Sequence, residues 1–248
     1  MTRDGSAPLA ARCAAQPHRT TMHIITIRLS LANVFLVRGE RWIVIDSGAP
    51  GDGPAILRAA ARHGIAPADI GLILLTHGHL DHFGGAAELR ASTGAPIAVH
   101  RADLALLREG RNPTSLRSTG LEGQLLRPFL PWRTTPLEPD MTFEDSFDLS
   151  PFGIATRTVH TPGHSAGHSA LPLPDGNLIA GDLLRGGFLG GRLRGRLPNP
   201  PYFVTDAAQQ AASLQLALGL PAHTWHIGHG GPLAVEHIRA RAKRPGLA

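Results

Sequence analysis

Four side chains able to bind a metal ion lie within six residues of one another, inside the segment 72–85. They are His77, His79, Asp81 and His82. Imidazole nitrogens and carboxylate oxygens are the usual protein ligands of zinc, and they also bind iron and manganese. The alternative is a polar loop with surface histidines, but it does not predict the further His and Asp residues that occur downstream. The segment therefore predicts a metal site.

The position of this motif relative to a strand indicates how it is held. The apolar run at residues 72–75 has the length and branching of a buried strand, and His77 follows just after it. We therefore expect the ligands in a loop at the C-terminal end of a strand. An extended backbone would turn His77, His79 and Asp81 to one side, and a tighter turn would bring His82 to a neighbouring point. Such a loop can serve two adjacent metal ions.

Other predicted strands also end in His or Asp residues. Asp46 follows a strand at residues 42–45, where its carboxylate either orients a ligand imidazole or forms a turn before Gly48. Three more candidate ligands follow later strands: His164, Asp182 and His229. Three further histidines near these loops are expected beside the site rather than as ligands: His160, His168 and His226.

The rest of the pattern predicts alternating strands and helices. Residues 54–63 begin with Pro and are followed by Gly64, which is typical of a helix. This helix lies between strands at 42–45 and 70–75, so a crossover and at least one parallel strand pair are expected. Further strands are predicted at 23–37, 96–99, 154–159, 169–173, 177–180 and 224–227. Further helices are predicted from 85 to about 94 and at 103–108, 206–218 and 235–241.

Two segments depart from this pattern. Residues 109–140 contain repeated prolines together with Phe129 and Trp132, so we expect an insertion that folds over the site as a lid. A surface loop packed by its own side chains is the alternative. Residues 182–196 are rich in glycine and arginine, which predicts a mobile basic loop able to hold an anionic group.

Length and composition favour a globular protein. The chain has 248 residues, 42% of them hydrophobic, and no apolar run long enough to span a membrane. Residues 1–21 are expected to be a disordered leader and residues 22–248 a single domain. Cys13, the only cysteine, lies in that leader, so no intrachain disulfide is expected and a cytoplasmic location is favoured.

The net charge of +5 comes almost entirely from arginine, since Lys243 is the only lysine. A basic balance is compatible with nucleic acid or anionic substrates. Because the arginines are scattered along the chain, we favour an ordinary solvated surface.

The order and spacing of these His and Asp residues resemble the metallo-β-lactamase superfamily. The motif residues are Asp46, the sequence His77-x-His79-x-Asp81-His82, His164, Asp182 and His229. The similarity covers about residues 23–241. It implies an α/β fold, an αβ/βα four-layer sandwich in which two mixed β-sheets are flanked by helices. It also implies two divalent metal ions at one edge of the sheets, with Zn²⁺ expected and iron or manganese as alternatives.

The resemblance also implies a role for each ligand. The first metal would be bound by His77, His79 and His164. The second would be bound by Asp81, His82 and His229. Asp182 would bridge the two ions, and Asp46 would support the cluster. Two ions about 3.5–4 Å apart lower the pKa of a shared water, so a metal-bridging hydroxide becomes the nucleophile. Asp81 would orient this hydroxide and later carry a proton to the leaving group.

The leading hypothesis is a dinuclear metal-dependent hydrolase that cleaves a small-molecule ester, lactone or thioester. Asp182 argues against a true β-lactamase, because the antibiotic-hydrolysing branches usually lack an acidic bridge at this motif. A short C-terminal region counts against glyoxalase II. Candidate substrate-binding residues are Arg185, Arg194 and Tyr202, although packing is the simpler role for Tyr202. The arginines would favour an anionic substrate.

Two competing hypotheses are kept. One is a mono-iron dioxygenase acting on a thiol or persulfide. The other is a basic nucleic-acid-binding protein or nuclease that uses the arginines at 192–196. We expect a small-molecule substrate and neither a membrane nor a nucleic acid as partner, and a homodimer is left open.

Overall fold

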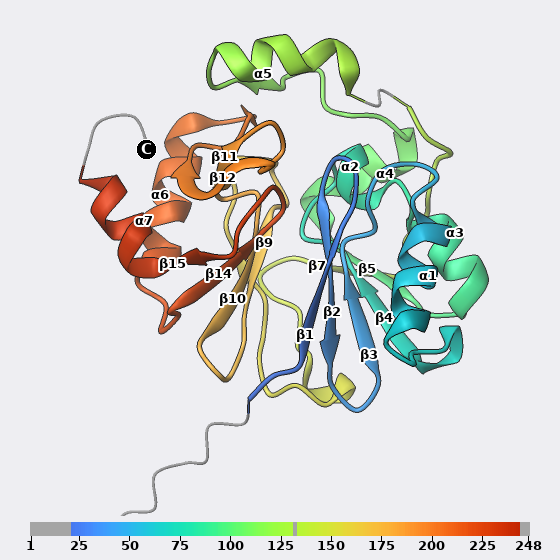
Figure 1. The fold of residues 1–248 in the computed structure, drawn as a ribbon. Helices are drawn as coiled ribbons and strands as arrows, with labels where there is room; N and C mark the ends of the chain where they lie inside the picture. The colour runs from blue at the N-terminus through green and yellow to red at the C-terminus, as the bar shows by residue number, and fades with distance from the viewer. Residues whose placement is uncertain (1–20, 131–132, 244–248) are drawn as a thin grey trace, which may run out of the picture.

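Two β-sheets face each other, with helices on the outer side of each (Figure 1). The computed structural model describes residues 21–130 and 133–243. The strand order is β1-β2-β3-β4-β5-β7 in one sheet and β15-β14-β10-β9-β8 in the other. The predicted α/β class and four-layer sandwich are thus confirmed. The leader predicted at residues 1–21 lies outside the described residues except for Thr21, and so does the aromatic Trp132.

The first sheet is formed by the N-terminal half of the chain. Its strands are β1 (Ile24–Arg28), β2 (Asn33–Arg38), β3 (Trp42–Ile45), β4 (Ile70–Leu74), β5 (Ile97–His100) and β7 (Met141–Phe143). Strands β3, β4, β5 and β7 are parallel, as predicted for β3 and β4. The crossover helices are α1 (Gly53–Arg62) and α3 (Ala86–Thr93). The prediction of one strand at 23–37 is wrong, because Leu29 and Ala32 close a turn between antiparallel β1 and β2.

The second sheet is formed by the C-terminal half. Its strands are β8 (Val159–His160), β9 (Ser169–Pro172), β10 (Asn177–Gly181), β14 (Thr224–Ile227) and β15 (Leu233–Ala234). The predicted β9–β10 hairpin is confirmed, and β10 runs parallel to β14. Helices α6 (Ala207–Leu218) and α7 (Val235–Ala242) cover it. Asp206 caps α6, since its carboxylate accepts hydrogen bonds from the N–H groups of Ala208 and Gln209.

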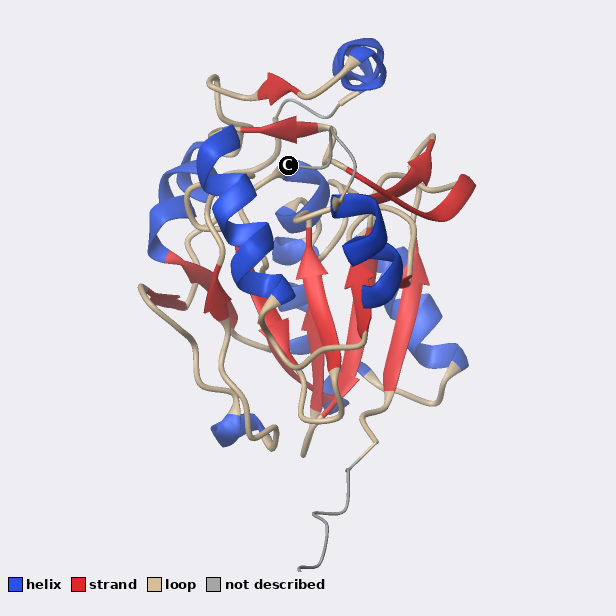
Figure 2. Cartoon of the chain, turned by 90° about the vertical axis from the view of Figure 1, so that its left-hand side faces the viewer, coloured by secondary structure: helices blue, strands red, loops and turns tan. Residues whose placement is uncertain are grey.

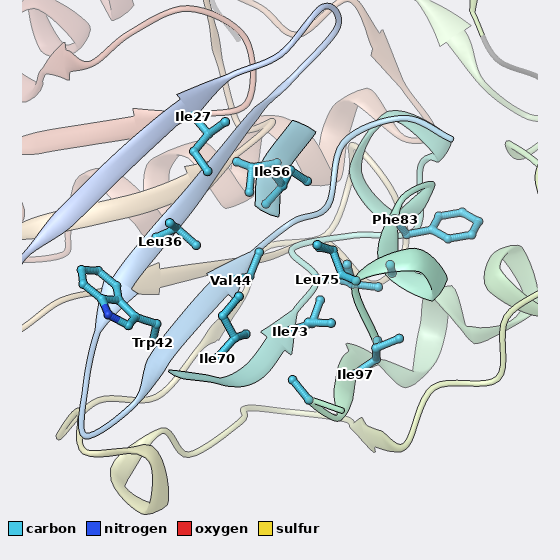
Figure 3. Packing of buried hydrophobic residues seen from close by; sticks show 14 of the residues in the cluster. Ile27, Leu36, Trp42, Val44, Ile56, Ile70, Ile73, Leu75, Phe83 and Ile97 are labelled. Carbon is cyan, nitrogen blue, oxygen red and sulfur yellow. The ribbon is translucent and has the colours of Figure 1, made fainter. Parts of the chain in front are cut away.

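Alternation along the buried strands builds the layers. In β2, Leu36 packs in the cluster shared with α1, whereas Phe35 packs in the cluster between the sheets. Figure 3 shows Leu36, Val44 and Ile73 in the same buried cluster as Ile56 of α1. Full burial of such a side chain contributes about 1.5–3 kcal/mol. The layers therefore hold the strand ends in fixed positions. No helix among the described residues is long and apolar enough to cross a membrane.

The two irregular segments contain regular structure. Residues 109–140 include β6 (Arg117–Ser118) and α5 (Leu121–Leu126), and α5 stands beyond one edge of the sheets (Figures 1 and 2). The predicted basic loop is instead a hairpin of β11 (Arg185–Phe188) and β12 (Leu193–Asn199). Glycines make this turn possible, since Gly190 and Gly191 both adopt positive φ.

The chain between β12 and α6 returns to the segment that carries α5. Strand β13 (Phe203–Val204) pairs antiparallel with β6. The remaining short elements are α2 (Leu80–Phe83), α4 (Leu104–Glu109) and 3-10 turns at Pro67–Asp69, Arg101–Asp103, Arg127–Phe129 and Ser150–Phe152.

Candidate metal centre

The motif after β4 is only partly extended. His79 has an extended backbone, and the next residues form the short helix α2. The expectation that Asp81 continues an extended run is therefore wrong. Helical geometry turns successive side chains about 100° apart, and His82 Nε2 lies 3.8 Å from Asp81 Oδ2.

The residues predicted as metal ligands lie around one point at the strand ends. Within each of three groups, the ligand atoms lie no more than 4.8 Å apart. The groups are His77, His79 and His164; His77, His82 and Asp182; and Asp81, His82 and His229. The first and third are the same sets that the resemblance implies for two metals.

Asp182 lies between these two sets. Its Oδ2 atom is 3.4 Å from His164 Nε2 and 3.1 Å from His229 Nε2. Its Oδ1 atom is 3.6 Å from His82 Nε2. One carboxylate therefore faces imidazoles of both sets. The close packing requires glycine at 228, because a β-carbon there would collide with the Asp182 carboxylate and the His82 ring.

The imidazoles are oriented through their Nδ1 atoms. His164 Nδ1 lies 2.8 Å from the carbonyl oxygen of Phe203, and His229 Nδ1 lies 2.8 Å from that of Leu31. Because a carbonyl only accepts, Nδ1 carries the proton in both rings. Burial holds the pKa of His164 below its ordinary value, so this ring is neutral and turns an unprotonated Nε2 toward the cluster. At His229, the carboxylates of Asp182 and Asp81 outweigh burial and raise the pKa.

Asp46 orients two further imidazoles from the end of β3. Its carboxylate accepts from His82 Nδ1 at 2.8 Å and from the Thr76 hydroxyl at 2.9 Å. The Thr76 oxygen in turn accepts from His77 Nδ1 at 2.9 Å. Asp46 has a positive φ of 64°, a strained conformation for a residue other than glycine. This backbone turn brings its buried carboxylate beneath the ligand loop, rather than leaving it a simple turn former.

The arrangement of acceptor atoms fits bound metal. The Nε2 atoms of His77 and His164 lie 3.1 Å apart, and both rings have their proton on Nδ1. Two lone pairs at this distance repel unless a cation lies beside them. Among the described residues, three buried atoms of the cluster also have no hydrogen-bond partner: His79 Nε2, His82 Nε2 and Asp182 Oδ1. This set of nitrogen and oxygen donors suits zinc, iron or manganese.

The histidines of the cluster differ in the direction in which their pKa values are shifted. Burial, reinforced by neighbouring imidazoles, holds the pKa of His77 and of His79 well below the ordinary value, so these rings are neutral. Burial also opposes protonation of His82, but the carboxylates of Asp182, Asp46 and Asp81 outweigh it and raise its pKa to about 10. A metal ion bound at His82 would therefore displace a proton.

Two buried residues outside the predicted ligand set connect the loops: Asp103, which the sequence did not single out, and His168, which was expected beside the site. Asp103 accepts hydrogen bonds from the N–H of Gly78, the hydroxyl of Ser165 and the N–H of Gly167. It thereby joins the His77–His79 loop to the His164 loop. Its position a few residues after β5 was the available signal, but it was assigned to a helix start.

His168 is the second of these residues. Its Nε2 accepts from the backbone N–H of Asp182 at 3.0 Å, and its Nδ1 lies 2.9 Å from the Thr161 hydroxyl. It supports Asp182 and does not belong to any of the three ligand groups. The other two uncertain histidines lie elsewhere: His160 stacks on His100, and His226 bonds to Asn177.

A cavity of about 420 Å³ opens onto the cluster. Tyr202 lines it, as does Arg192, which was not among the predicted substrate-binding residues. Arg185 is directed elsewhere, because its guanidinium pairs with Glu122 at 3.0 Å and stacks over the Tyr202 ring. Arg194 is exposed on the hairpin and is not a lining residue. Of the three residues predicted to bind substrate, Tyr202 lines this cavity, whereas Arg185 and Arg194 do not.

Residues 27–229 match the family described as the metallo-beta-lactamase superfamily. The chain belongs to this superfamily, and its fold and histidine motif are those of a metallo-hydrolase.

Several individual proteins of known sequence or structure are similar to this chain. The chain is 25% identical to the probable metallo-hydrolase YflN of Bacillus subtilis, over 88% of this chain and 87% of that protein. It is 30% identical to a hydroxyacylglutathione hydrolase of Alkalilimnicola ehrlichii over 78% of this chain, but spans only 62% of that enzyme. Among solved structures, it resembles TTHA1623 in a di-iron-bound form, with 29% identity, coverage of 88% and 96%, and a TM-score of 0.60. The B3 metallo-beta-lactamase BLEG-1 shares the fold at 23% identity, coverage of 89% and 97%, and a TM-score of 0.63.

Proposed function

We propose that this protein is a dinuclear metal-dependent hydrolase that cleaves a small-molecule thioester, ester or lactone. The observation that carries the proposal is the orientation of the imidazoles. Asp46, Thr76 and backbone carbonyls hold the Nδ1 atoms, and the Nε2 atoms converge on Asp81 and Asp182. The relatives named as hydroxyacylglutathione hydrolases support a thioester among these substrates. The di-iron-bound relative supports a pair of ions.

The proposed ligand sets follow the three groups. His77, His79 and His164 would hold one ion, and Asp81, His82 and His229 the other, with Asp182 facing both. When bound, two such ions polarise an acyl oxygen and supply hydroxide at neutral pH, and Zn²⁺, iron and manganese all suit these donors.

Two carboxylates of the chain have roles in this chemistry. Asp182 lies between the two imidazole sets, and its carboxylate would offset part of the charge of two bound cations. Asp81 is partly exposed, and its carboxylate would take up a proton and pass it to the leaving group. In thioester hydrolysis the acyl C–S bond breaks, the water oxygen joins the acyl carbon, and the sulfur leaves as a thiol.

Metal analysis and activity measurements test the proposal together. We expect about two equivalents of zinc, iron or manganese per chain and turnover of thioesters that chelation abolishes and metal restores. The His79→Ala variant should lose metal and activity while keeping the circular dichroism of the parent. The His63→Ala variant, at an exposed residue that follows the last residue of α1, is the matched control.

The competing functions give different results in the same experiment. One iron per chain with oxygen uptake on a thiol or persulfide would replace the hydrolase by a dioxygenase. Salt-sensitive cleavage of nucleic acid without thioester turnover would indicate a nuclease.

A further inference from the structure

One wall of the cavity beside the metal centre is formed by apolar residues that are not among the candidate metal ligands. Leu116, Leu126, Phe129 and Leu130 line it from the segment that carries α5, and Leu189 lines it from the hairpin turn. Leu116 belongs to a small cluster with Tyr202 and Phe203, against which Leu126 and Leu130 pack. This cluster is separate from the three larger clusters of the sandwich. It forms a wall over the metal ligands rather than part of the main core.

Parts of this wall remain open to solvent. Phe129 is 78% exposed although it lines the cavity, and Leu189 is 58% exposed. Large apolar side chains exposed together mark binding surfaces. An apolar chain in the cavity would cover the parts of both side chains that line it. A small polar acyl group would leave them exposed.

The cavity lining carries few cationic side chains. Apart from the histidines of the cluster, Arg192 is the one cationic residue among those that line it. No ion pair joins Arg192 to a carboxylate within the described residues. A single guanidinium suits one anionic group. Glutathione carries two carboxylates and an ammonium group, which this lining does not match.

We infer that the substrate is an amphiphile, a thioester or ester with a linear apolar acyl chain against the Leu116–Leu130 wall and one anionic group at Arg192. The inference rests on the proposed hydrolase function and specifies its substrate class. Each added methylene should raise kcat/KM about fourfold until the cavity is filled, as expected from the free energy of burying one methylene.

Paired synthetic thioesters test both parts. Acetyl, butyryl, hexanoyl and octanoyl thioesters of 3-mercaptopropionate are compared with those of 3-mercaptopropionamide, which lacks the negative charge. The metal-loaded full chain should prefer longer chains and the anionic series. Octanoyl 3-mercaptopropionate should also exceed octanoylglutathione. Equal kcat/KM across chain lengths, or no preference for the anionic series, would overturn the inference.

Matched variants locate the two contacts. Arg192→Gln should remove the preference for the anionic series, whereas Arg194→Gln, on the same hairpin but outside the cavity, should keep it. Leu126→Ala should lower kcat/KM for the octanoyl substrate about threefold to tenfold and leave acetyl unchanged. Leu125→Ala, its exposed neighbour outside this cavity, should have no such effect. An equal effect of both arginine variants, or of both leucine variants, contradicts the assigned contacts.

Binding of thioether analogues separates this inference from the proposed hydrolase. S-octyl and S-ethyl 3-mercaptopropionate cannot be hydrolysed, and calorimetry measures their Kd for the metal-loaded protein. Tighter octyl binding without any turnover would refute the hydrolase and support the ligand class. Turnover with equal octyl and ethyl binding would support the hydrolase and refute the ligand class.

Discussion

The ligand loops and the cover above them, residues 116–130, are held in different ways. His77, His82 and His164 are buried and each is anchored through Nδ1. The cover instead exposes Leu121, Leu125 and Phe129 to solvent. A salt bridge, backbone pairing of β6 with β13 and the small Tyr202 cluster attach it to the body.

This difference separates two functions within one site. Buried hydrogen bonds fix the positions of the metal ligands, because any displacement would leave buried polar groups without partners. The cover has fewer buried hydrogen bonds of this kind. Its apolar side chains can therefore be substituted without displacing the metal ligands. The chemistry is therefore expected to depend on the loops and substrate choice on the cover.

The largest effect should come from Asp182→Ala, which acts on the ligand loops alone. The variant removes the carboxylate that faces both imidazole sets. We expect metal content to fall below two equivalents and turnover to fall by more than about 100-fold, beyond the effect of losing a supporting residue. Elemental analysis and steady-state kinetics measure both. Asp148→Ala, at an exposed ion pair, serves as the control. Full activity with two metals would refute the bridging role.

The metal loops were more accessible to sequence reasoning than the residues that support them. The candidate ligands stand in a short motif and at strand ends, so local pattern was enough to propose them. Asp103 was missed because its partners Ser165 and Gly167 are 62 and 64 residues away in the sequence. Only the packed sheets bring them together.

The cover and hairpin were the hardest parts to predict. The sequence indicated arginine near the site but selected Arg185 and Arg194 rather than Arg192. Which side chain faces the cavity depends on the hairpin register, and that register is irregular between Gly186 and Phe188. Positive φ at Leu189 and Arg194 changes the direction of the chain further. Composition carries no information about these local turns.

The second largest expected effect is a loss of stability when Asp103, which hydrogen-bonds to both ligand loops, is replaced. Asp103→Ala leaves three donors without their acceptor: the N–H groups of Gly78 and Gly167 and the Ser165 hydroxyl. Unpaired buried donors cost about 1–3 kcal/mol each, so the free energy of unfolding should fall by about 3 kcal/mol or more. Urea unfolding of the metal-free protein measures this loss. Asp69→Ala, which removes an exposed backbone contact to Ala66, should cost less than about 1 kcal/mol. Similar losses in both variants would show that Asp103 does not join the loops.

The smallest expected effect comes from loosening the cover. Glu122 on α5 accepts from the N–H of Leu189 at 2.6 Å, and its carboxylate lies 3.0 Å from the Arg185 guanidinium. Glu122→Gln keeps the shape and removes the charge. Because this pair is largely buried, the free energy of unfolding should fall by about 1 kcal/mol. KM for a long-chain thioester should rise about threefold to tenfold, with kcat and metal content unchanged, as expected for loss of uniform binding.

A double-mutant cycle decides whether this effect passes through the salt bridge. Arg185→Gln should raise KM as Glu122→Gln does, and the double variant should be little worse than either, because both remove one interaction. Glu236→Gln, an exposed residue on α7, is the control. Strict additivity would show that Glu122 and Arg185 act separately. Loss of metal in Glu122→Gln would show that the cover and the ligand loops are coupled, and the division between chemistry and substrate choice would fail.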